Sequence, residues 1–119
     1  MTKDRFRFRI PITNLDGVFD RFIFCDVYHE PIHFIGSAIF LTPEQCTGLK
    51  DKNGRLIYEG DIVAYSGIDL WRVVFEEKYC SFELLGKDGM SVSVSVHKEM
   101  TVVGNVHENP ELLEANNGN

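Results

Sequence analysis

The sequence lacks the features that would place the protein in a membrane or in an oxidising compartment. Its three cysteines, at positions 25, 46 and 80, are odd in number, widely spaced and without a Cys-x-x-Cys pair. This pattern argues against a disulfide framework and favours a reducing compartment. The apolar stretches are far shorter than the ~20 residues that span a bilayer, and the first residues lack the apolar run of a signal peptide. We therefore expect a cytoplasmic protein without a membrane partner.

Recognisable catalytic motifs are also lacking. The turn at residues 86–89 contains glycine and lysine, but not with the GxxxxGK[ST] spacing of a phosphate-binding loop. No nucleophile elbow accompanies the cysteines and the four histidines. Acidic pairs such as Glu76 and Glu77 are adjacent in an expected turn, whereas acid–base catalysis needs two carboxylates in unlike environments across a cleft. We expect neither enzymatic activity nor a cofactor.

The net charge of −6 is unevenly distributed. Residues 1–55 contain eight Lys or Arg and seven Asp or Glu, whereas residues 56–119 contain four and eleven. Phosphate binding draws mostly on clustered Lys and Arg. The acidic second half therefore disfavours a broad nucleic-acid footprint, although it leaves room for a small basic patch.

The N-terminal residues alternate between basic and apolar side chains, which predicts a half-buried strand over residues 5–12. The expected core face consists of Phe6, Phe8, Ile10 and Ile12. The opposite, exposed face continues from Lys3 and consists of Lys3, Arg5, Arg7 and Arg9. Pro11 predicts an edge position or a strand exit. A charged edge strand that resists aggregation is the simpler interpretation, and a row that grips phosphates is the alternative.

Most of the remaining chain predicts a mostly β fold. Short strands at about 10-residue spacing are expected at residues 62–65, 71–75, 79–85, 90–97 and 101–106. Valines and serines alternate at 91–96, which directs the valines inward. Strand number and length favour a small SH3-like barrel. Trp71, the only tryptophan, is either a core residue or part of a binding groove.

One domain spans residues 1–119, with N-terminal strands at 1–45 and the barrel-like meander at 46–108. Thr42, Pro43 and Gln45 predict a helix start of at most one turn. Asn109 and Pro110 predict a short helix at 109–115 for the same reason, followed by a frayed tail at 116–119.

Cys25, His29 and His33 form the sharpest metal-site candidate, with Asp26 and Glu30 between them. On a helix their spacing would place all three on one face. The surrounding residues favour extended structure, in which four residues span about 13 Å. Zinc ligands must all lie about 2.0–2.3 Å from one ion. We therefore expect an ordinary hairpin and no metal.

Two blocks of the sequence resemble the YopX family of bacteriophage and prophage proteins. They are TGLKDKNGRLIYEGDIV at residues 47–63 and VGNVHENPELL at residues 103–113. The stretch from Phe6 to Arg9 is similar to the first strand of the family. Where the family continues with a Trp-Asp pair, this chain has Ile10 and Pro11, so its first hairpin is expected to be built differently. The resemblance implies a phage or prophage origin and no particular activity.

The residues of this signature also have structural interpretations. Glycines are expected where the chain reverses, and Asp51 and Asp61 can accept hydrogen bonds from turn amides. We expect a mainly architectural role for the whole set, which is Gly48, Asp51, Asn53, Gly54, Tyr58, Glu59, Gly60, Asp61, Gly104, Asn109 and Pro110.

Three hypotheses for the function follow. The first is a non-enzymatic accessory or interaction module that binds a protein, including a second copy of itself. The second is a nucleic-acid-binding protein that uses the arginines of the N-terminal strand. The third, an enzyme with a cleft that the sequence does not reveal, has the least support.

Overall fold

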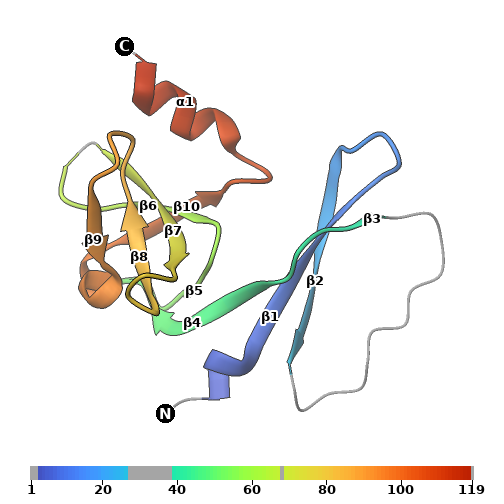
Figure 1. Cartoon of the computed structure of the whole chain (residues 1–119), viewed down its shortest axis with the longest axis horizontal. Coiled ribbons are helices and arrows are strands. Elements are labelled where there is room, and N and C mark those ends of the chain that lie inside the picture. Colours follow the sequence, from blue (N-terminus) through green and yellow to red (C-terminus); the bar gives the residue numbers. More distant parts are fainter. Residues whose placement is uncertain (1–2, 27–38, 68, 119) are drawn as a thin grey trace.

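The computed structural model describes residues 3–26, 39–67 and 69–118. These residues form two antiparallel sheets and a C-terminal helix (Figure 1). The fold is mostly β, with a curled meander and a short helix, as the sequence predicts. The likeness to an SH3 barrel stays a prediction. Within the described part of the chain, every helix is too short or too polar to cross a bilayer.

The first sheet is a long hairpin extended by a strand that leads into the rest of the molecule. Its strands are β1 (Arg7–Thr13), β2 (Phe19–Asp26), β3 (Ile39–Phe40), β4 (Glu44–Lys50) and β5 (Leu56–Tyr58). The order is β2-β1-β4-β5, and β3 also pairs with β1. The side chain of Asn14 closes the β1–β2 turn by accepting hydrogen bonds from the amides of Asp16 and Val18. β4 pairs with β1 at its start and with β5 further along, so it connects the two parts of the molecule.

The second sheet is a meander that curls on itself (Figure 1). Its strands are β6 (Asp61–Ala64), β7 (Leu70–Glu76), β8 (Ser81–Leu85), β9 (Ser91–Ser93) and β10 (Thr101–Asn105). Their order is β10-β6-β7-β8-β9. A 3-10 helix, η2 (Val94–Glu99), follows β9, and the α-helix α1 (Pro110–Gly118) follows β10. The helix therefore extends into the residues that we expected to form a frayed tail.

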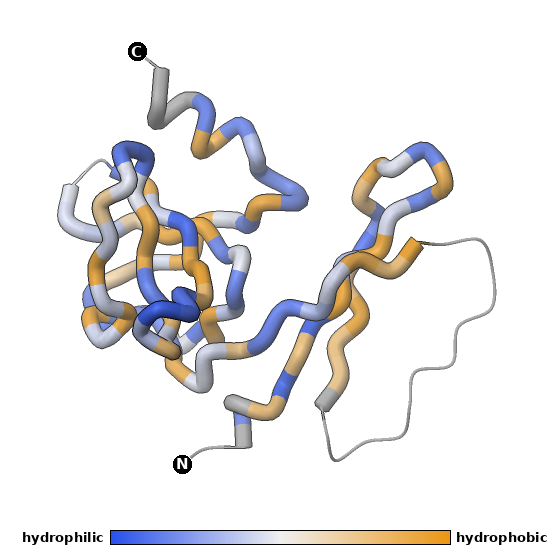
Figure 2. Tube along the Cα trace, in the orientation of Figure 1, coloured by the Kyte–Doolittle hydropathy of each residue, from blue (hydrophilic) through white to orange (hydrophobic). Residues whose placement is uncertain are grey.

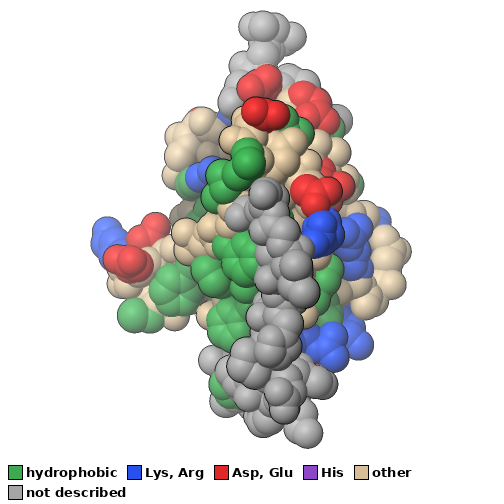
Figure 3. Space-filling model, turned by 90° about the vertical axis from the view of Figure 1, so that its right-hand side faces the viewer, with side chains coloured by type: hydrophobic (Ala, Val, Ile, Leu, Met, Phe, Trp, Pro, Cys, Tyr) green, Lys and Arg blue, Asp and Glu red, His purple; other side chains and the backbone are tan. Residues whose placement is uncertain are grey.

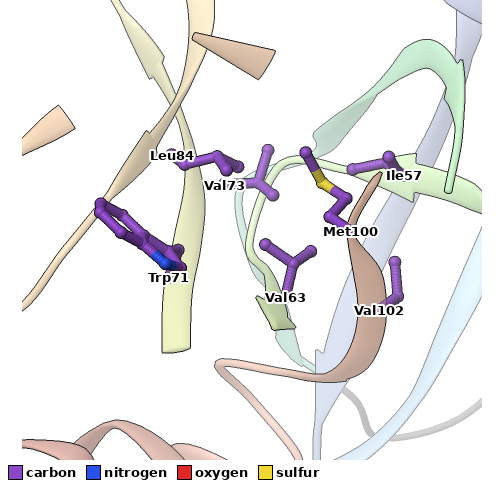
Figure 4. Packing of buried hydrophobic residues seen from close by; sticks show 7 residues of the cluster. All are labelled: Ile57, Val63, Trp71, Val73, Leu84, Met100 and Val102. Carbon is purple, nitrogen blue, oxygen red and sulfur yellow. The ribbon is translucent and has the colours of Figure 1, made fainter. Parts of the chain in front are cut away.

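The hydrophobic core lies inside the curled sheet (Figure 4). Its buried members are Ile57, Val63, Trp71, Val73, Leu84, Met100 and Val102. Trp71 is one of them, and its indole N–H donates to the carbonyl of Tyr65 at 3.2 Å. Val92, Val94 and Val96 pack against this cluster, as the valine–serine alternation predicts.

The strand predicted at 90–97 is correct only for its first half. β9 ends at Ser93, and the hydroxyl of Ser93 accepts a hydrogen bond from the amide of Ser95 at 3.1 Å. This side-chain bond supports the start of η2. Over six residues, the alternation of apolar and polar side chains does not distinguish a strand from a strand that continues as a 3-10 helix.

The N-terminal strand differs from its prediction in position and surroundings. Residues 3–6 form a 3-10 helix, η1 (Lys3–Phe6), and β1 starts at Arg7. β1 lies between β2 and β4 and is therefore not an edge strand. Pro11 lies inside β1, where its carbonyl accepts from the amide of Leu41. The N–H and C=O of one strand residue point to the same side of the strand. The N–H that proline lacks would therefore point toward the segment that contains Leu41, and not toward β2.

The helix turn predicted at residues 42–45 is wrong. Residues 41–43 have no regular structure, and Glu44 begins β4 opposite Arg9 of β1. Local capping preferences are worth about 1 kcal/mol. Pairing with β1 and a buried ion pair between the two side chains outweigh them here.

Candidate functional site

A buried arginine lies where the first sheet meets the curled sheet. Arg9, in β1, is only 3% exposed. Its Nε donates to Glu44 Oε1 of β4 at 2.8 Å, and its Nη1 lies 2.9 Å from Asp61 Oδ1 of β6. Its Nη2 donates to the carbonyl of Glu59, in the β5–β6 turn, at 3.2 Å. One guanidinium therefore joins three segments that are distant in the sequence.

Aromatic rings enclose this guanidinium. Arg9 Cζ lies 4.3 Å from the ring centroid of Phe22 and 4.9 Å from that of Tyr58. Both distances fall within the range of cation–π attraction. Phe24, from the same strand as Phe22, meets the ring of Tyr58 edge-on at 5.9 Å. The rings exclude water from the ion pairs and so strengthen them.

Glu44 extends the network to the segment that follows β10. Its Oε2 lies 2.8 Å from His107 Nε2. The imidazole stacks on Phe19, with centroids 5.8 Å apart, and meets the edge of Phe22 at the same distance. The C-terminal segment is thus fastened to β2 as well as to β4. We call Arg9, Glu44, Asp61 and His107 the Arg9 cluster.

Asp61 is the most buried acid of the cluster. Its Oδ2 accepts from the amide of Tyr58 at 2.8 Å, which closes the β5–β6 turn. Burial raises the pKa of the Asp61 carboxyl, while the charge of Arg9 and the Tyr58 amide act against this rise. Burial also raises the pKa of the Tyr58 hydroxyl. The contacts of Asp61 are those of a structural carboxylate that holds a turn and an arginine.

Gly60 allows Glu44 to reach this position. Its φ of +89° is unfavourable for residues with a Cβ, and a Cβ placed there would lie 2.5 Å from Glu44 Oε2. Gly54 has a similar φ of +84° but nothing within 4 Å of the same point. Substitution of Gly54 therefore introduces backbone strain alone, whereas substitution of Gly60 introduces backbone strain and a clash with Glu44.

We predict that Gly60→Ala lowers the free energy of unfolding by about 2–4 kcal/mol and Gly54→Ala by about 1–2 kcal/mol. Both variants bear the cost of a positive φ, but only the first displaces a buried carboxylate from its partners. Urea unfolding of both variants measures the difference. Equal losses of unfolding free energy in the two variants would mean that Glu44 can move away from the added methyl group without cost.

A second buried acid holds the tight turn between β4 and β5. Asp51 Oδ1 accepts from the amides of Asn53 and Arg55, and its Oδ2 accepts from the amide of Val102 in β10, all at 2.9 Å. Burial acts to raise the pKa of Asp51, but the three amide donors together hold it below its usual value. Asp51 thereby ties the signature turn to the edge of the curled sheet.

The second signature block forms a comparable local network. Asn109 Oδ1 accepts from the amide of Asn105 at 3.2 Å, and Asn105 Oδ1 accepts from the amides of His107 and Glu108. A side chain at Gly104 would collide with Asn109. These contacts are of the architectural kind expected for the signature, and they set the position of His107.

Two open grooves border the Arg9 cluster. One has a volume of about 540 Å³ and is lined by Phe40, Leu41, Thr42, Pro43, Glu44, Glu59 and His107. The other, which we call the basic groove, has a volume of about 450 Å³. It is lined by Arg7, Arg9, Phe24, Lys50, Gly54, Arg55, Leu56, Tyr58 and Asp61. The first groove is acidic, and the second combines cationic and aromatic side chains.

The structure places the members of the predicted basic row in two different elements. Lys3 and Arg5 lie in η1, before the strand begins. Arg7 is exposed and lies 3.3 Å from Asp4, whereas Arg9 is buried in the cluster. The expectation that Arg9 is exposed is therefore wrong, because its charge is neutralised by two acids that the sequence pattern did not associate with it. Trp71 lies in the core, and the edge of its side chain also lines a small surface hollow of about 120 Å³ together with Leu70 and Met90.

The sequence prediction also missed Glu44 and His107. The contact between them joins residues 63 positions apart, and no local pattern signals it. Of the metal-site candidate, Cys25 lies half-buried at the end of β2, whereas His29 and His33 lie outside the described residues. Among the residues that the structure describes, no group of three potential metal ligands occurs.

The fold and this junction define a small β protein in which a hairpin sheet is joined to a curled meander by buried ion pairs. A family model described as YopX protein matches residues 20–114. The chain belongs to the YopX family, as its two sequence blocks indicate.

Among solved structures, the chain is similar to protein EF1440 from Enterococcus faecalis. The two are 25% identical, with a TM-score of 0.48, and the match covers 87% of this chain and 74% of the other. The search of curated proteins gives no match.

Proposed function

We propose that this protein is a non-enzymatic accessory module of a phage or prophage, which acts in the cytoplasm by binding another protein. The observation that carries the proposal is the closed state of its strongest chemical cluster. Both oxygens of Glu44 and both oxygens of Asp61 contact groups of the protein itself. Carboxylates engaged in this way stabilise the junction, and this favours a structural role for the cluster over a catalytic one.

Two of the three thiols fit the same proposal. Cys46 is fully buried in β4, and burial raises the pKa of its thiol, which keeps it protonated and unreactive. Cys80 is exposed in a surface turn, where its Sγ contacts the carbonyl of Glu77. Neither arrangement resembles a nucleophile activated by a neighbouring base.

A protein partner is favoured by apolar side chains at the free end of the first sheet. Leu15 and Val18 in the β1–β2 turn are 70% and 60% exposed. Ile39 and Phe40 of β3 lie beside the same end of β1 and are more than two-fifths exposed. Figure 2 shows apolar residues interspersed with polar ones at this end of the sheet, and Figure 3 shows hydrophobic side chains on the side of the molecule that the first sheet occupies. We call these four residues the tip patch.

The tip patch suits a protein–protein contact for energetic reasons. Groups of exposed apolar side chains on neighbouring segments mark interaction sites when they form a large enough surface. Each large side chain that a partner covers contributes on the order of 1.5–3 kcal/mol when it leaves water completely. The patch lies at the far end of the hairpin from the basic groove, so a partner there leaves the groove open.

We predict that the double variant Val18→Ser/Phe40→Ser loses partner binding but keeps the fold. Capture from phage-infected or lysogenic host cells, with the full chain as bait, tests this, and light scattering of the purified chain detects self-association. Val103→Ser is the matched control, because Val103 is 43% exposed on β10 of the curled sheet. A wild-type chain that stays monomeric and retains no specific protein would contradict the proposal. Equal capture by the double variant would exclude the tip patch as the binding surface.

A further inference from the structure

We propose that the basic groove binds single-stranded nucleic acid. This inference is separate from the protein-binding role, because it concerns a different surface and a ligand of different chemistry. The groove places three cationic side chains from different segments around exposed aromatic surface. Phosphates and an unstacked base are the ligand groups that fit these two features.

The cations come from three places in the chain. Arg7 belongs to β1, Lys50 ends β4, and Arg55 follows the turn between β4 and β5. All three residues are exposed. Their convergence makes a local positive site although the net charge of the chain is −6. The uneven charge of the sequence is compatible with a small basic patch of this kind.

Among the acids whose side chains the structure describes, those nearest the groove already have partners. Asp61 lines its floor but is paired with Arg9 at 2.9 Å. Asp51 is 5% exposed, and its carboxylate is directed to backbone amides of the turn and of β10. Asp4 lies 3.3 Å from Arg7, and the two side chains are 27% and 51% exposed. Ion pairs that solvent reaches are weak, so a phosphate can compete with Asp4 for Arg7.

Phe24 supplies the stacking surface. Its side chain is 63% exposed although it borders a groove. Its ring centroid lies 6.0 Å from that of Phe22 and 5.9 Å from that of Tyr58, so one part of the ring packs on these two rings. An aromatic face that is held in place and still open to solvent can stack on a base without a large ordering cost. Duplex bases are already stacked on each other, so the site selects single strands.

The volume of about 450 Å³ is that of a small-ligand site. We therefore expect contact with one or two nucleotides. Binding should depend strongly on salt, because three cations contribute most of the attraction. The acidic remainder of the chain repels long polyanions, which makes binding local and weak.

Fluorescence anisotropy of the full chain with a labelled 12-nucleotide oligo-dT tests the proposal, with a duplex of the same length and inorganic polyphosphate as competitors. We expect binding at low salt that falls at least ten-fold between 50 and 200 mM salt. We also expect oligo-dT to bind at least five-fold more tightly than either competitor. The triple variant Arg7→Ala/Lys50→Ala/Arg55→Ala should lower the affinity at least ten-fold.

Phe24→Leu tests the stacking step, because leucine keeps the packing on Tyr58 but offers no aromatic face. It should lower the affinity of oligo-dT about ten-fold and leave that of polyphosphate unchanged. Phe75→Leu and Lys98→Ala are the controls. Phe75 is 43% exposed and contacts Phe82 in the curled sheet, and Lys98 is exposed in η2. Circular dichroism establishes that each variant is folded.

Absence of binding at low salt would overturn the proposal. So would equal affinity for polyphosphate and oligo-dT, or a folded Phe24→Leu variant that binds oligo-dT as tightly as wild type. The tip-patch variant Val18→Ser/Phe40→Ser should bind oligo-dT normally. Failure of the groove proposal is thereby distinguished from failure of the protein-binding proposal.

Discussion

Replacement of Arg9 by methionine is expected to lower the free energy of unfolding by about 3–5 kcal/mol. Methionine fills much of the space between Phe22 and Tyr58, so the loss is not mainly one of packing. The cause is that Glu44 and Asp61 remain buried without the charge that balances them. Domains of this size have total stabilities of about 5–15 kcal/mol. A large share of the stability of the protein therefore depends on one side chain.

Arg7→Met is the matched control for this prediction. Arg7 belongs to the same strand and also has an acidic neighbour, Asp4, but the side chain of Arg7 is 51% exposed, compared with 4% for that of Arg9. Exposed pairs contribute about 0–1 kcal/mol. Urea unfolding monitored by Trp71 fluorescence measures both variants. Similar losses for Arg7→Met and Arg9→Met would show that burial of the Arg9 cluster has no special effect on stability.

The second large effect is expected at Asp51, where alanine should cost about 3–4 kcal/mol. The substitution leaves three backbone amides without their acceptor, and one of them, that of Val102, belongs to a buried strand position. Hydrogen bonds to a charged group contribute about 1.5–3 kcal/mol each when removed singly, and losses at one site are not additive. Asp88→Ala is the control, because in the described part of the chain Asp88 accepts from the amide of Met90 alone, in an exposed turn. It should cost less than about 1 kcal/mol.

Asp51 also makes a prediction about pH. The pKa of Asp51 is lower in the folded state than its ordinary value. Its carboxylate therefore stabilises the fold fully above about pH 4, the ordinary pKa of aspartate, and this contribution is lost as the pH falls through the lower folded pKa. Asp51→Asn lacks this dependence. The difference in melting temperature between wild type and Asp51→Asn should shrink as the pH falls from about 5 to about 2. A difference that stays constant over this range would contradict the lowered pKa of Asp51.

Elements encoded by neighbouring residues were predictable from the sequence. Asn53 and Gly54 indicate the tight turn, and Gly54 adopts the positive φ that this turn requires. The alternation of valine and serine from residue 91 to residue 96 indicates which side chains reach the core, even where the backbone changes from β9 to η2. Both signals act over a few residues, and tertiary packing agrees with them.

The junction of the two sheets was not predictable in the same way. The alternation of β1 assigns Arg9 to a solvent-facing row, because periodicity assumes that a strand has one polar and one apolar side. Glu44 of the neighbouring strand β4 and Asp61 of β6 lie on that side, and their carboxylates make burial of an arginine possible. The contact between Glu44 and His107 depends on segments 63 residues apart. Ion pairs between segments this far apart in the chain produce no local pattern in a single sequence, so they could not be predicted from it.

A double-mutant cycle between Arg9→Met and Asp61→Asn tests most directly whether the Arg9 cluster joins the two sheets. Arg9 belongs to the first sheet and Asp61 to the curled sheet, and asparagine can still accept from the Tyr58 amide. We predict a coupling free energy of about 2 kcal/mol or more, with less than about 0.5 kcal/mol for the exposed control pair Arg7→Met and Asp4→Asn. Additive losses for Arg9 and Asp61 would contradict the account, because the two sheets would then be held together without this ion pair.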